Sequence, residues 1–345
     1  MIEIFGLSRS FELVTANIPY LNLQWNRRYY EAGGFSLQID ASVYDPSWHF
    51  IMTHDRPEVG VVQKVQYDNE GGERLVLLSG FFAEQMLDGL VCFPRFITDK
   101  AHTETAVKAL CEKLTLEARK GIAFIGNDSP LGDRTQLDFI GDKLGSKLFS
   151  TLETRELSYR VIADAEFRSL SMSVWQGADR RQSQNENSWA VFSTSWGNVE
   201  KESVSLDSSA YANVCLVSAN DEAVQFELDN SGGGERFEVY LDKNAEKPDD
   251  DQTAADFRAG LEQEAMEKLA SCVKSIDIEI DNYGSEGYME DFDLGDLVTV
   301  QLEDIALELE TRIVEVSEVF KPEGHTVSLG FGSKRISNIE RAVNA

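Results

Sequence analysis

The residue types that most often carry enzyme chemistry are sparse in this chain. It has four histidines: His49, His54, His102 and His325. His49 and His54 are the only close pair, and no HExxH pattern, which would place two histidines on one helix face to bind zinc, surrounds them. The serine-hydrolase turn GxSxG and the phosphate loop GxxxxGK[ST] are also absent. We therefore interpret the histidines as ordinary loop or strand residues.

The cysteines lie far apart in the sequence and form no CxxC pair. They are Cys92, Cys111, Cys215 and Cys272. A catalytic cysteine needs a thiolate with a partner side chain close in space. None of the four cysteines stands in a sequence context typical of a cysteine-enzyme family. We predict free, mostly buried thiols in a reducing compartment.

Carboxylates are too abundant to single out a catalytic pair, because the chain has 60 aspartates and glutamates. The densest group is Glu286, Glu290, Asp291, Asp293 and Asp296, whose spacing does not fit the EF-hand loop. A solvated acidic loop is the favoured interpretation, with a Ca²⁺ site as the alternative. We select no catalytic, cofactor-binding or metal-binding residue, and we predict no cofactor.

Two further features could suggest a ligand. The segment DNSGGGE at residues 229–235 lacks the strand-loop-helix order of a phosphate cradle, so we predict a flexible hairpin loop. The tryptophans are Trp25, Trp48, Trp175, Trp189 and Trp196. They could line a sugar-binding face, but large aromatic residues in β-domains more often fill cores or subunit interfaces.

The chain is long enough for two or more domains and is strongly acidic. It has 345 residues and a net charge of −28. This charge excludes binding to nucleic acid or an anionic membrane by electrostatic attraction. The N-terminus has no signal-peptide pattern, and no apolar run approaches the roughly 20 residues that span a bilayer. We expect synthesis in the cytoplasm and no membrane anchor.

Along the chain, the type of predicted secondary structure changes twice. Residues 1–82 consist of short alternating strands with glycine-rich turns, including a hairpin around residues 69–72. Residues 83–166 have helical spacing: one segment starts at Thr103 as N-cap and stops at Gly121, and another carries a stripe of leucine and isoleucine at residues 137, 140, 144 and 148. Strands return over residues 167–345, with one helix at about 253–273. The predicted fold is α+β and predominantly β: two β-barrel-like domains and a small α+β domain between them.

The last part of the chain predicts a β-hairpin with an irregularity. Residues 294–320 alternate between apolar and polar, but the parity of the apolar positions changes between Ile313 and Val314. Side chains alternate strictly along a regular strand, so this change predicts a β-bulge or a sharp barrel corner there.

Several segments, taken in order, resemble siphophage tail-hub proteins. They are YLNLQWNRRYYEAGGFSLQI, VGVVQKVQYD with ERLVLLSGFFAEQMLDGLVCFPRF, FSTSWGNVEKESVSLDSSAYANVCLVSA, and LGDLVTVQ with ETRIVEVSEVF and VSLGFG. The resemblance covers nearly the whole chain. One departure is ERFEVYLD, where related proteins tend to have a doubled arginine and Phe237 intervenes here.

The resemblance implies a structural virion protein: a tail-tip or baseplate hub of the kind found at the N-terminus of tail-associated lysins. Such hubs are homotrimers with two β-barrel-like domains per subunit, arranged as a pseudo-sixfold ring. The implied partners are the distal tail protein ring, the tape-measure protein, and receptor-binding or fibre proteins, with DNA only as passing cargo. Because the chain stops at Ala345, we expect no lysin extension. We also expect the ring to have an acidic inner wall that repels phosphates.

Two other classes of protein stay open at this point. A cell-wall hydrolase would lose all activity when one His–carboxylate or Cys–His pair is mutated. A carbohydrate-binding or receptor-binding module of the tail would lose saturable glycan binding when an exposed tryptophan is replaced. A contractile-tail or injection-machine hub would share the architecture of the siphophage hub.

Overall fold

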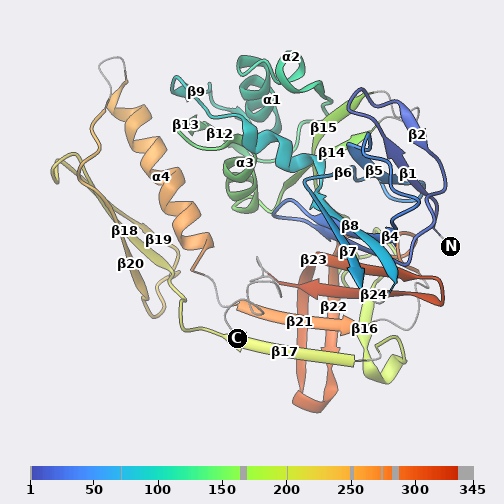
Figure 1. The fold of residues 1–345 in the computed structure, drawn as a ribbon. Helices are drawn as coiled ribbons and strands as arrows, with labels where there is room; N and C mark the ends of the chain where they lie inside the picture. The colour runs from blue at the N-terminus through green and yellow to red at the C-terminus, as the bar shows by residue number, and fades with distance from the viewer. Residues whose placement is uncertain are drawn as a thin grey trace.

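The fold is described from a computed structural model that covers residues 2–70, 72–163, 169–199, 201–248, 252–272, 275–281 and 287–332. Strands dominate, and the few helices gather in two regions (Figure 1). The expected α+β, predominantly β class is confirmed. No helix within these ranges is long and apolar enough to cross a membrane.

The largest element is a ten-stranded sheet to which both ends of the chain contribute. Its main path has the order β17-β21-β24-β23-β3-β4-β8-β7; off this path, β22 pairs with β23, and β16 pairs with β22. The strands from the first segment are β3 (Asn22–Arg28), β4 (Gly34–Asp40), β7 (Lys64–Glu70) and β8 (Glu73–Phe81). Those from the last segment are β16 (Val191–Ser193), β17 (Lys201–Asp207), β21 (Ser275–Asp281), β22 (Leu297–Leu302), β23 (Leu307–Lys321) and β24 (Gly324–Phe331).

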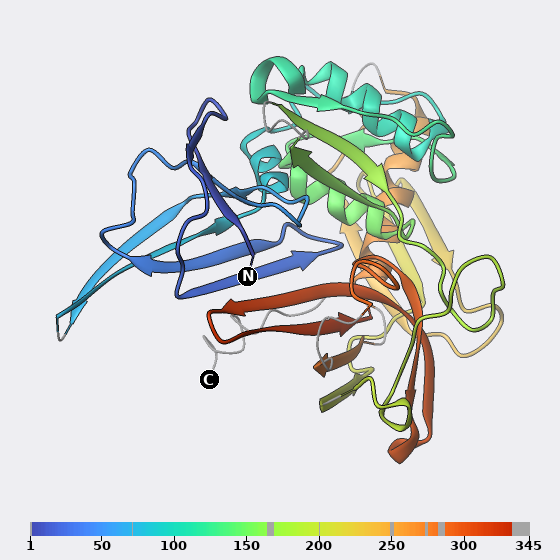
Figure 2. The same cartoon turned by 90° about the vertical axis from the view of Figure 1, so that its right-hand side faces the viewer.

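The two segments meet where β3 pairs antiparallel with β23. The register runs from Arg28 opposite Glu315 to Leu23 opposite Phe320. Figure 2 shows the red β23–β24 hairpin alongside the blue strands of the first segment. The two β regions that the sequence separates are therefore one continuous sheet, and the division of the chain at residues 82 and 166 stays a prediction.

The local predictions for these strands are confirmed. β7 and β8 pair as a hairpin, and so do β22 and β23, with a short 3-10 helix, η3 (Glu303–Ile305), near the turn. The pairing of β23 with β24 shifts register between Ile313 and Glu315, where the change in parity predicts a bulge. The bulge lets Ile313 and Val316 both face the core, although an unbroken strand would point them to opposite faces.

A smaller sheet of the first segment has the order β2-β1-β5-β6. Its strands are β1 (Ile4–Leu7), β2 (Leu13–Thr15), β5 (Phe50–Thr53) and β6 (Gly60–Val61). It shares a hydrophobic core with β3, β4 and β8 of the large sheet, in which Trp25 and Leu37 are fully buried. Gly80 on β8 is required there, because a Cβ at this position would lie 1.8 Å from the carbonyl oxygen of Val61.

The middle unit combines short strands with four helical segments, η1 being a 3-10 helix. The helical segments are η1 (Ala83–Gly89), α1 (Thr103–Lys113), α2 (Leu116–Lys120) and α3 (Leu144–Glu153). The strands are β9 (Phe96–Ile97), β10 (Ala101–His102), β11 (Ile122–Phe124), β12 (Arg134–Thr135), β13 (Asp138–Phe139), β14 (Ser158–Ala163) and β15 (Leu170–Trp175). Of these, β11, β15 and β14 form a three-stranded sheet against which the helices pack.

Two helix predictions in this unit need correction. The leucine–isoleucine stripe at residues 137–148 is not one helix: residues 138–139 pair as β13 with β9, and Gly141 has a φ of 75°, so α3 begins only at Leu144. The segment after Thr103 breaks into α1 and α2 at Thr115, which has a φ of 50°. Its predicted stop is confirmed, because Gly121 ends α2 in the left-handed conformation. The N-cap of α1 is His102 and not Thr103.

A fourth unit is inserted between the paired strands β17 and β21. It contains β18 (Val214–Ala219), β19 (Val224–Asp229), β20 (Glu238–Lys243) and α4 (Ala254–Ala270), which is the helix expected at about 253–273. Phe257 and Leu261 of α4 share a core with Cys215 and Val217 of β18. The prediction of a hairpin loop at DNSGGGE is wrong, because β19 and β20 both pair with β18, on opposite sides of it. The loop crosses the end of the central strand, a connection that only the tertiary structure reveals.

Candidate functional site: a buried charge network and the adjoining clefts

The most unusual feature of the interior is a network of charged side chains where the first and last segments meet. Arg27 projects from β3 into the core and is only 3% exposed. Its Nε donates to Glu58 Oε1 at 2.6 Å, and its Nη1 donates to Asp293 Oδ1 at 2.5 Å and to Tyr288 Oη at 2.8 Å. One guanidinium therefore ties β3 to a loop of the first segment and to the loop before β22.

Glu318 of β23 is the second centre of the network and is completely buried. Arg56 donates to its two carboxylate oxygens at 2.7 and 2.5 Å, and Tyr288 Oη lies 3.2 Å from Glu318 Oε1. His325 Nε2 lies 3.0 Å from Glu318 Oε2, and its ring stacks on Phe320 at a centroid distance of 4.0 Å. This carboxylate is therefore surrounded by donors.

Burial and ion pairing shift the pKa values of these groups in opposite directions. Burial disfavours the charged form of Glu318, but the hydrogen bonds from Arg56 and His325 outweigh it and hold the pKa of the carboxyl below its ordinary value. Burial likewise disfavours the charged form of Arg27, yet Glu58, Tyr288 and Asp293 together raise its pKa well above the ordinary value. The network thus brings two guanidinium groups beside three carboxyl groups. It has the properties of a clamp, since each charged group in it is held by an opposite charge.

Glu84 of η1 is another buried carboxyl, and its pKa is shifted in the opposite direction to that of Glu318. Its Oε1 accepts a hydrogen bond from the backbone N–H of Val161 at 2.9 Å, while Oε2 has no hydrogen-bond partner among the described residues. Burial raises the pKa of Glu84 to about 7. Glu84 lines a cleft of about 210 Å³ whose wall includes Arg28, Asp88 and Phe149, at the junction of the first segment with the middle unit.

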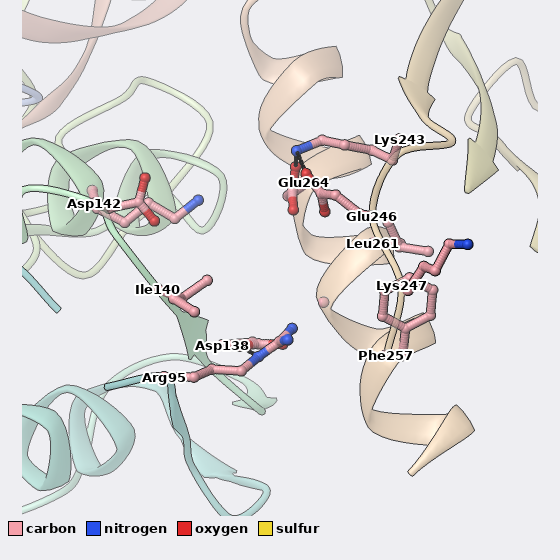
Figure 3. A pocket seen from close by; sticks show the side chains of 12 residues that line it. Arg95, Asp138, Ile140, Asp142, Lys243, Glu246, Lys247, Phe257, Leu261 and Glu264 are labelled. Atoms are coloured by element: carbon pink, nitrogen blue, oxygen red, sulfur yellow. Dashed lines mark hydrogen bonds and ion pairs between the residues drawn. The ribbon is translucent and has the colours of Figure 1, made fainter. Parts of the chain in front are cut away.

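A second cleft, of about 280 Å³, separates the middle unit from the inserted unit (Figure 3). It contains two ion pairs: Arg95 with Asp138 at 2.6 Å, and Lys243 with Glu264 at 2.6 Å. Gly260 of α4 allows the close approach, because a Cβ there would lie 2.7 Å from an Asp138 oxygen. Residues of both the middle unit and the inserted unit line the cleft.

The histidines and cysteines of the sequence do not come together in a site. His49 and His54 are exposed, with His54 beside Asp55, and His102 is exposed at the start of α1. His325 is different, because it belongs to the charge network, a role that no sequence pattern indicates. The prediction of free, mostly buried thiols is confirmed, since only Cys272 is partly exposed. Burial raises the pKa of Cys111 to about 12, which disfavours a thiolate.

The acidic loop is divided between separate structural roles. Asp293 pairs with Arg27, whereas Asp296 accepts hydrogen bonds from Ala178 N at 2.7 Å and from Arg180 Nε at 2.9 Å. Glu290 and Asp291 are exposed, and Glu286 lies outside the described residues. In the part of the chain that the structure describes, no group of three or more histidine, cysteine or acidic side chains could hold a metal ion.

Some of the tryptophans are buried and others are exposed. Trp25 and Trp48 are buried in the core of the first segment, as the favoured interpretation predicts. Trp189 and Trp196 are 54% and 60% exposed, and they lie at the two ends of the segment that contains β16.

Along its whole length the fold is similar to solved structures of prophage tail proteins. The 43 kDa tail protein of prophage MuSo2 from Shewanella oneidensis has a TM-score of 0.62 at 12% identity, over 96% of this chain and 98% of that one. The tail protein from Neisseria meningitidis MC58 has a TM-score of 0.61 at 13% identity, over 98% of both chains. Prophage tail protein gp18 from Listeria monocytogenes EGD-e has a TM-score of 0.57 at 12% identity, over 100% and 98%.

The fold is therefore that of a phage tail protein. Residues 2–333 match the Siphovirus ReqiPepy6 Gp37-like protein family, and the chain belongs to this family. No curated protein matches the chain. Family and fold together support a structural role in a phage tail, as a component of the virion.

Proposed function

We propose that the chain is a tail-tip or baseplate hub, three copies of which form a ring that closes or extends the tail tube and conducts DNA. The observation that carries the proposal is the composition of the large sheet. Four strands of its main path come from the first segment and four from the last. Two four-stranded units per subunit would place six such units around a threefold ring, which suits a tail tube with sixfold symmetry.

The edges of the sheet support a ring of this kind. In the described part of the chain, β7 and β17 each pair with one strand only, so each end of the main path is open. An open edge presents unpaired backbone N–H and C=O groups to another chain. Because the two edges differ, pairing between copies is head-to-tail, and such contacts close into a ring when the rotation between copies is suitable. We propose that β7 of one copy lies beside β17 of the next.

Apolar side chains on β7 favour this contact. Val65 and Tyr67 are 45% and 59% exposed. They stand opposite Leu78 and Val76 of β8, which are buried in the core of the first segment, so the apolar face of the sheet continues beyond the core to the open edge. A neighbouring copy that covers this edge would bury them.

The charge network supports the ring in a different way. A subunit that supplies two units of a pseudo-sixfold ring must hold them at a constant angle. Arg27, Arg56 and Glu318 lie at the β3–β23 junction, where such a constraint is needed. The remaining partners we propose are the distal tail protein ring, the tape-measure protein and receptor-binding or fibre proteins, with assembly into the virion in the host cytoplasm.

Mass measurement by light scattering and negative-stain electron microscopy test the proposal. We expect a particle of three times 38.6 kDa, a threefold class average and a central hole. The interfaces should bury on the order of 2,000 Å² or more. Compact particles without a hole would overturn the hub proposal and direct attention to cell-wall hydrolysis and glycan binding.

A double variant, Val65→Asp with Tyr67→Asp, tests the edge contact. We expect it to remain monomeric, because two carboxylates would be buried against the neighbouring copy. Phe93→Asp is the matched control, since Phe93 is 78% exposed in the middle unit, away from the sheet edge. A ring that forms equally well with both variants would contradict pairing through β7.

A further inference from the structure

The large sheet has one face against the protein cores and one face that they do not cover. On β3, β4 and β24 the residues that enter the cores alternate with others that are half-buried or exposed. Leu23, Trp25, Leu37 and Leu329, for example, are fully or almost fully buried. We call the opposite side of the six strands from β24 to β7 the open face. β17 and β21 are left out of it, because the side chains of β21 lie outside the described residues.

The centre of the open face consists almost entirely of uncharged polar residues. Three rows run across the strands in register. The first row is Thr326, Val319, Gln24, Ser36 and Ser79; the second is Ser328, Ser317, Asn26 and Gly34; the third is Asn22, Gln38, Leu77 and Gln66. No residue in these rows is charged, although 27% of the residues of the chain are. In register, the first row is followed by Lys64 of β7, opposite Ser79, and the second by Asp281 of β21, opposite Ser328.

Charged residues occur only around this centre. Lys64, Asp68, Glu73 and Asp40 lie toward the β7 side of the open face, and Lys321 lies at the end of β23. Arg28 and Glu315 are opposite each other in register and form a 4.0 Å ion pair, so they add no net charge. The centre of the open face therefore contributes nothing to the net charge of −28.

We propose that the open face lines the channel of the hub, as a neutral wall of amide and hydroxyl groups against which a DNA duplex passes. This inference rests on the proposed ring and changes the expectation of an acidic wall. The rest of each subunit covers the core side of the sheet, and the sheet edges join the neighbouring copies. The open face is then the side that remains for the hole.

The chemistry of the open face suits a passing duplex. Lysine or arginine side chains would hold phosphates through counterion release, and each neutralised phosphate would steepen the salt dependence of binding. Carboxylates would instead raise the electrostatic energy of the duplex at the channel. Uncharged amides and hydroxyls do neither and stay hydrated, so the wall exerts little attraction or repulsion on DNA at any salt concentration.

Lysines introduced on the open face provide the test, with linear and closed circular duplexes as probes. In the variant Gln24→Lys with Ser36→Lys, the two lysines are neighbours in register on β3 and β4. We expect the assembled ring of this variant to bind linear duplex DNA, with log K falling by about 0.9 per neutralised phosphate for each tenfold rise in salt. A closed circle has no end to thread through a closed ring, so it should bind at least tenfold more weakly. The unmodified ring should retain neither probe.

The control variant adds the same charge elsewhere. Gln225→Lys with Asn230→Lys places two lysines at exposed positions of the inserted unit, and any DNA binding that it causes should be equal for linear and circular DNA. If the open-face variant binds both probes equally, or binds neither while its ring is intact, the open face does not line the channel. A second open-face variant, Gln38→Lys with Gln66→Lys, replaces the first if that one fails to assemble. Absence of a ring in the unmodified protein overturns the proposed function itself, which electron microscopy distinguishes from the other outcomes.

Discussion

Replacement of Glu318 by glutamine should destabilise the junction of the two sheet halves by about 3 kcal/mol. Removal of one partner of a buried ion pair typically costs about 3–5 kcal/mol, because the other charge stays buried without compensation. The Glu318 side chain is completely buried, and that of its partner Arg56 is 9% exposed. Since Arg56 keeps some access to water, we place the cost at the lower end of the range.

The assay is equilibrium unfolding in urea, followed by tryptophan fluorescence. Trp25 reports on the relevant region, because it is buried in the core of the first segment and its Nε1 lies 3.4 Å from Glu58 of the network. Glu323→Gln is the matched control: it makes the same chemical change at an exposed position on the β23–β24 turn, and should alter the free energy of unfolding by less than about 0.5 kcal/mol. If Glu318→Gln also falls within about 1 kcal/mol of the unmodified protein, the network is not a clamp.

The pH dependence provides a second check on the same residue. The folded-state pKa of Glu318 lies below the ordinary value of 4.5. The stability that it contributes is therefore fully present above pH 4.5 and is lost as the pH falls through the folded-state pKa. We expect the difference in unfolding free energy between the unmodified protein and Glu318→Gln to shrink on acidification below that pH. A difference that grows on acidification would refute the assignment of a charged, paired carboxylate.

Three further predictions concern other parts of the molecule. Burial raises the pKa of Glu84 to about 7, so its charge opposes folding above that pH. The free energy of unfolding should therefore rise as the pH falls from 7 toward 4.5. In urea titrations, Glu84→Gln should show a smaller rise in this free energy than the unmodified protein. Gly80→Ala should destabilise the protein by about 1–3 kcal/mol, because the new methyl group meets the backbone of β6. Gly324→Ala, where the methyl group enters open space, should change the melting temperature little. In the folded protein a thiol reagent should modify Cys272 well before Cys111, and mass spectrometry of the labelled peptides checks this order; equal rates would contradict the burial of Cys111.

Much of the local structure was predictable because it depends on neighbouring residues. The hairpin around residues 69–72 follows from turn residues between alternating strands, and the bulge at Ile313 follows from a change of parity within one strand. The stop of α2 at Gly121 follows from the left-handed conformation that glycine tolerates. The predictions that are wrong fail where pairing overrides local periodicity. Leu137 and Ile140 have helical spacing, but the segment between them pairs with β9.

The candidate site was much less predictable. Arg27 shares the core-facing parity of Leu23 and Trp25 on β3, and a charged residue in that position is a signal for a buried partner. Its partner Asp293 is 266 residues away along the chain, and no spacing rule identifies such a partner. The neutral rows of the open face likewise exist only because Gln24 lies opposite Val319 of β23 and Ser36 of β4.

The sequence by itself determined the predominantly β class, the acidity of the chain, its free thiols and most of its hairpins. These properties depend on composition or on residues a few positions apart, where backbone geometry sets side-chain direction and turn type. Only the tertiary structure decided that both ends of the chain share one sheet, that charged residues close the junction, and that the centre of one sheet face is uncharged. Long-range strand pairing depends on the packing of the whole chain, and it alone brings together residues that are hundreds of positions apart.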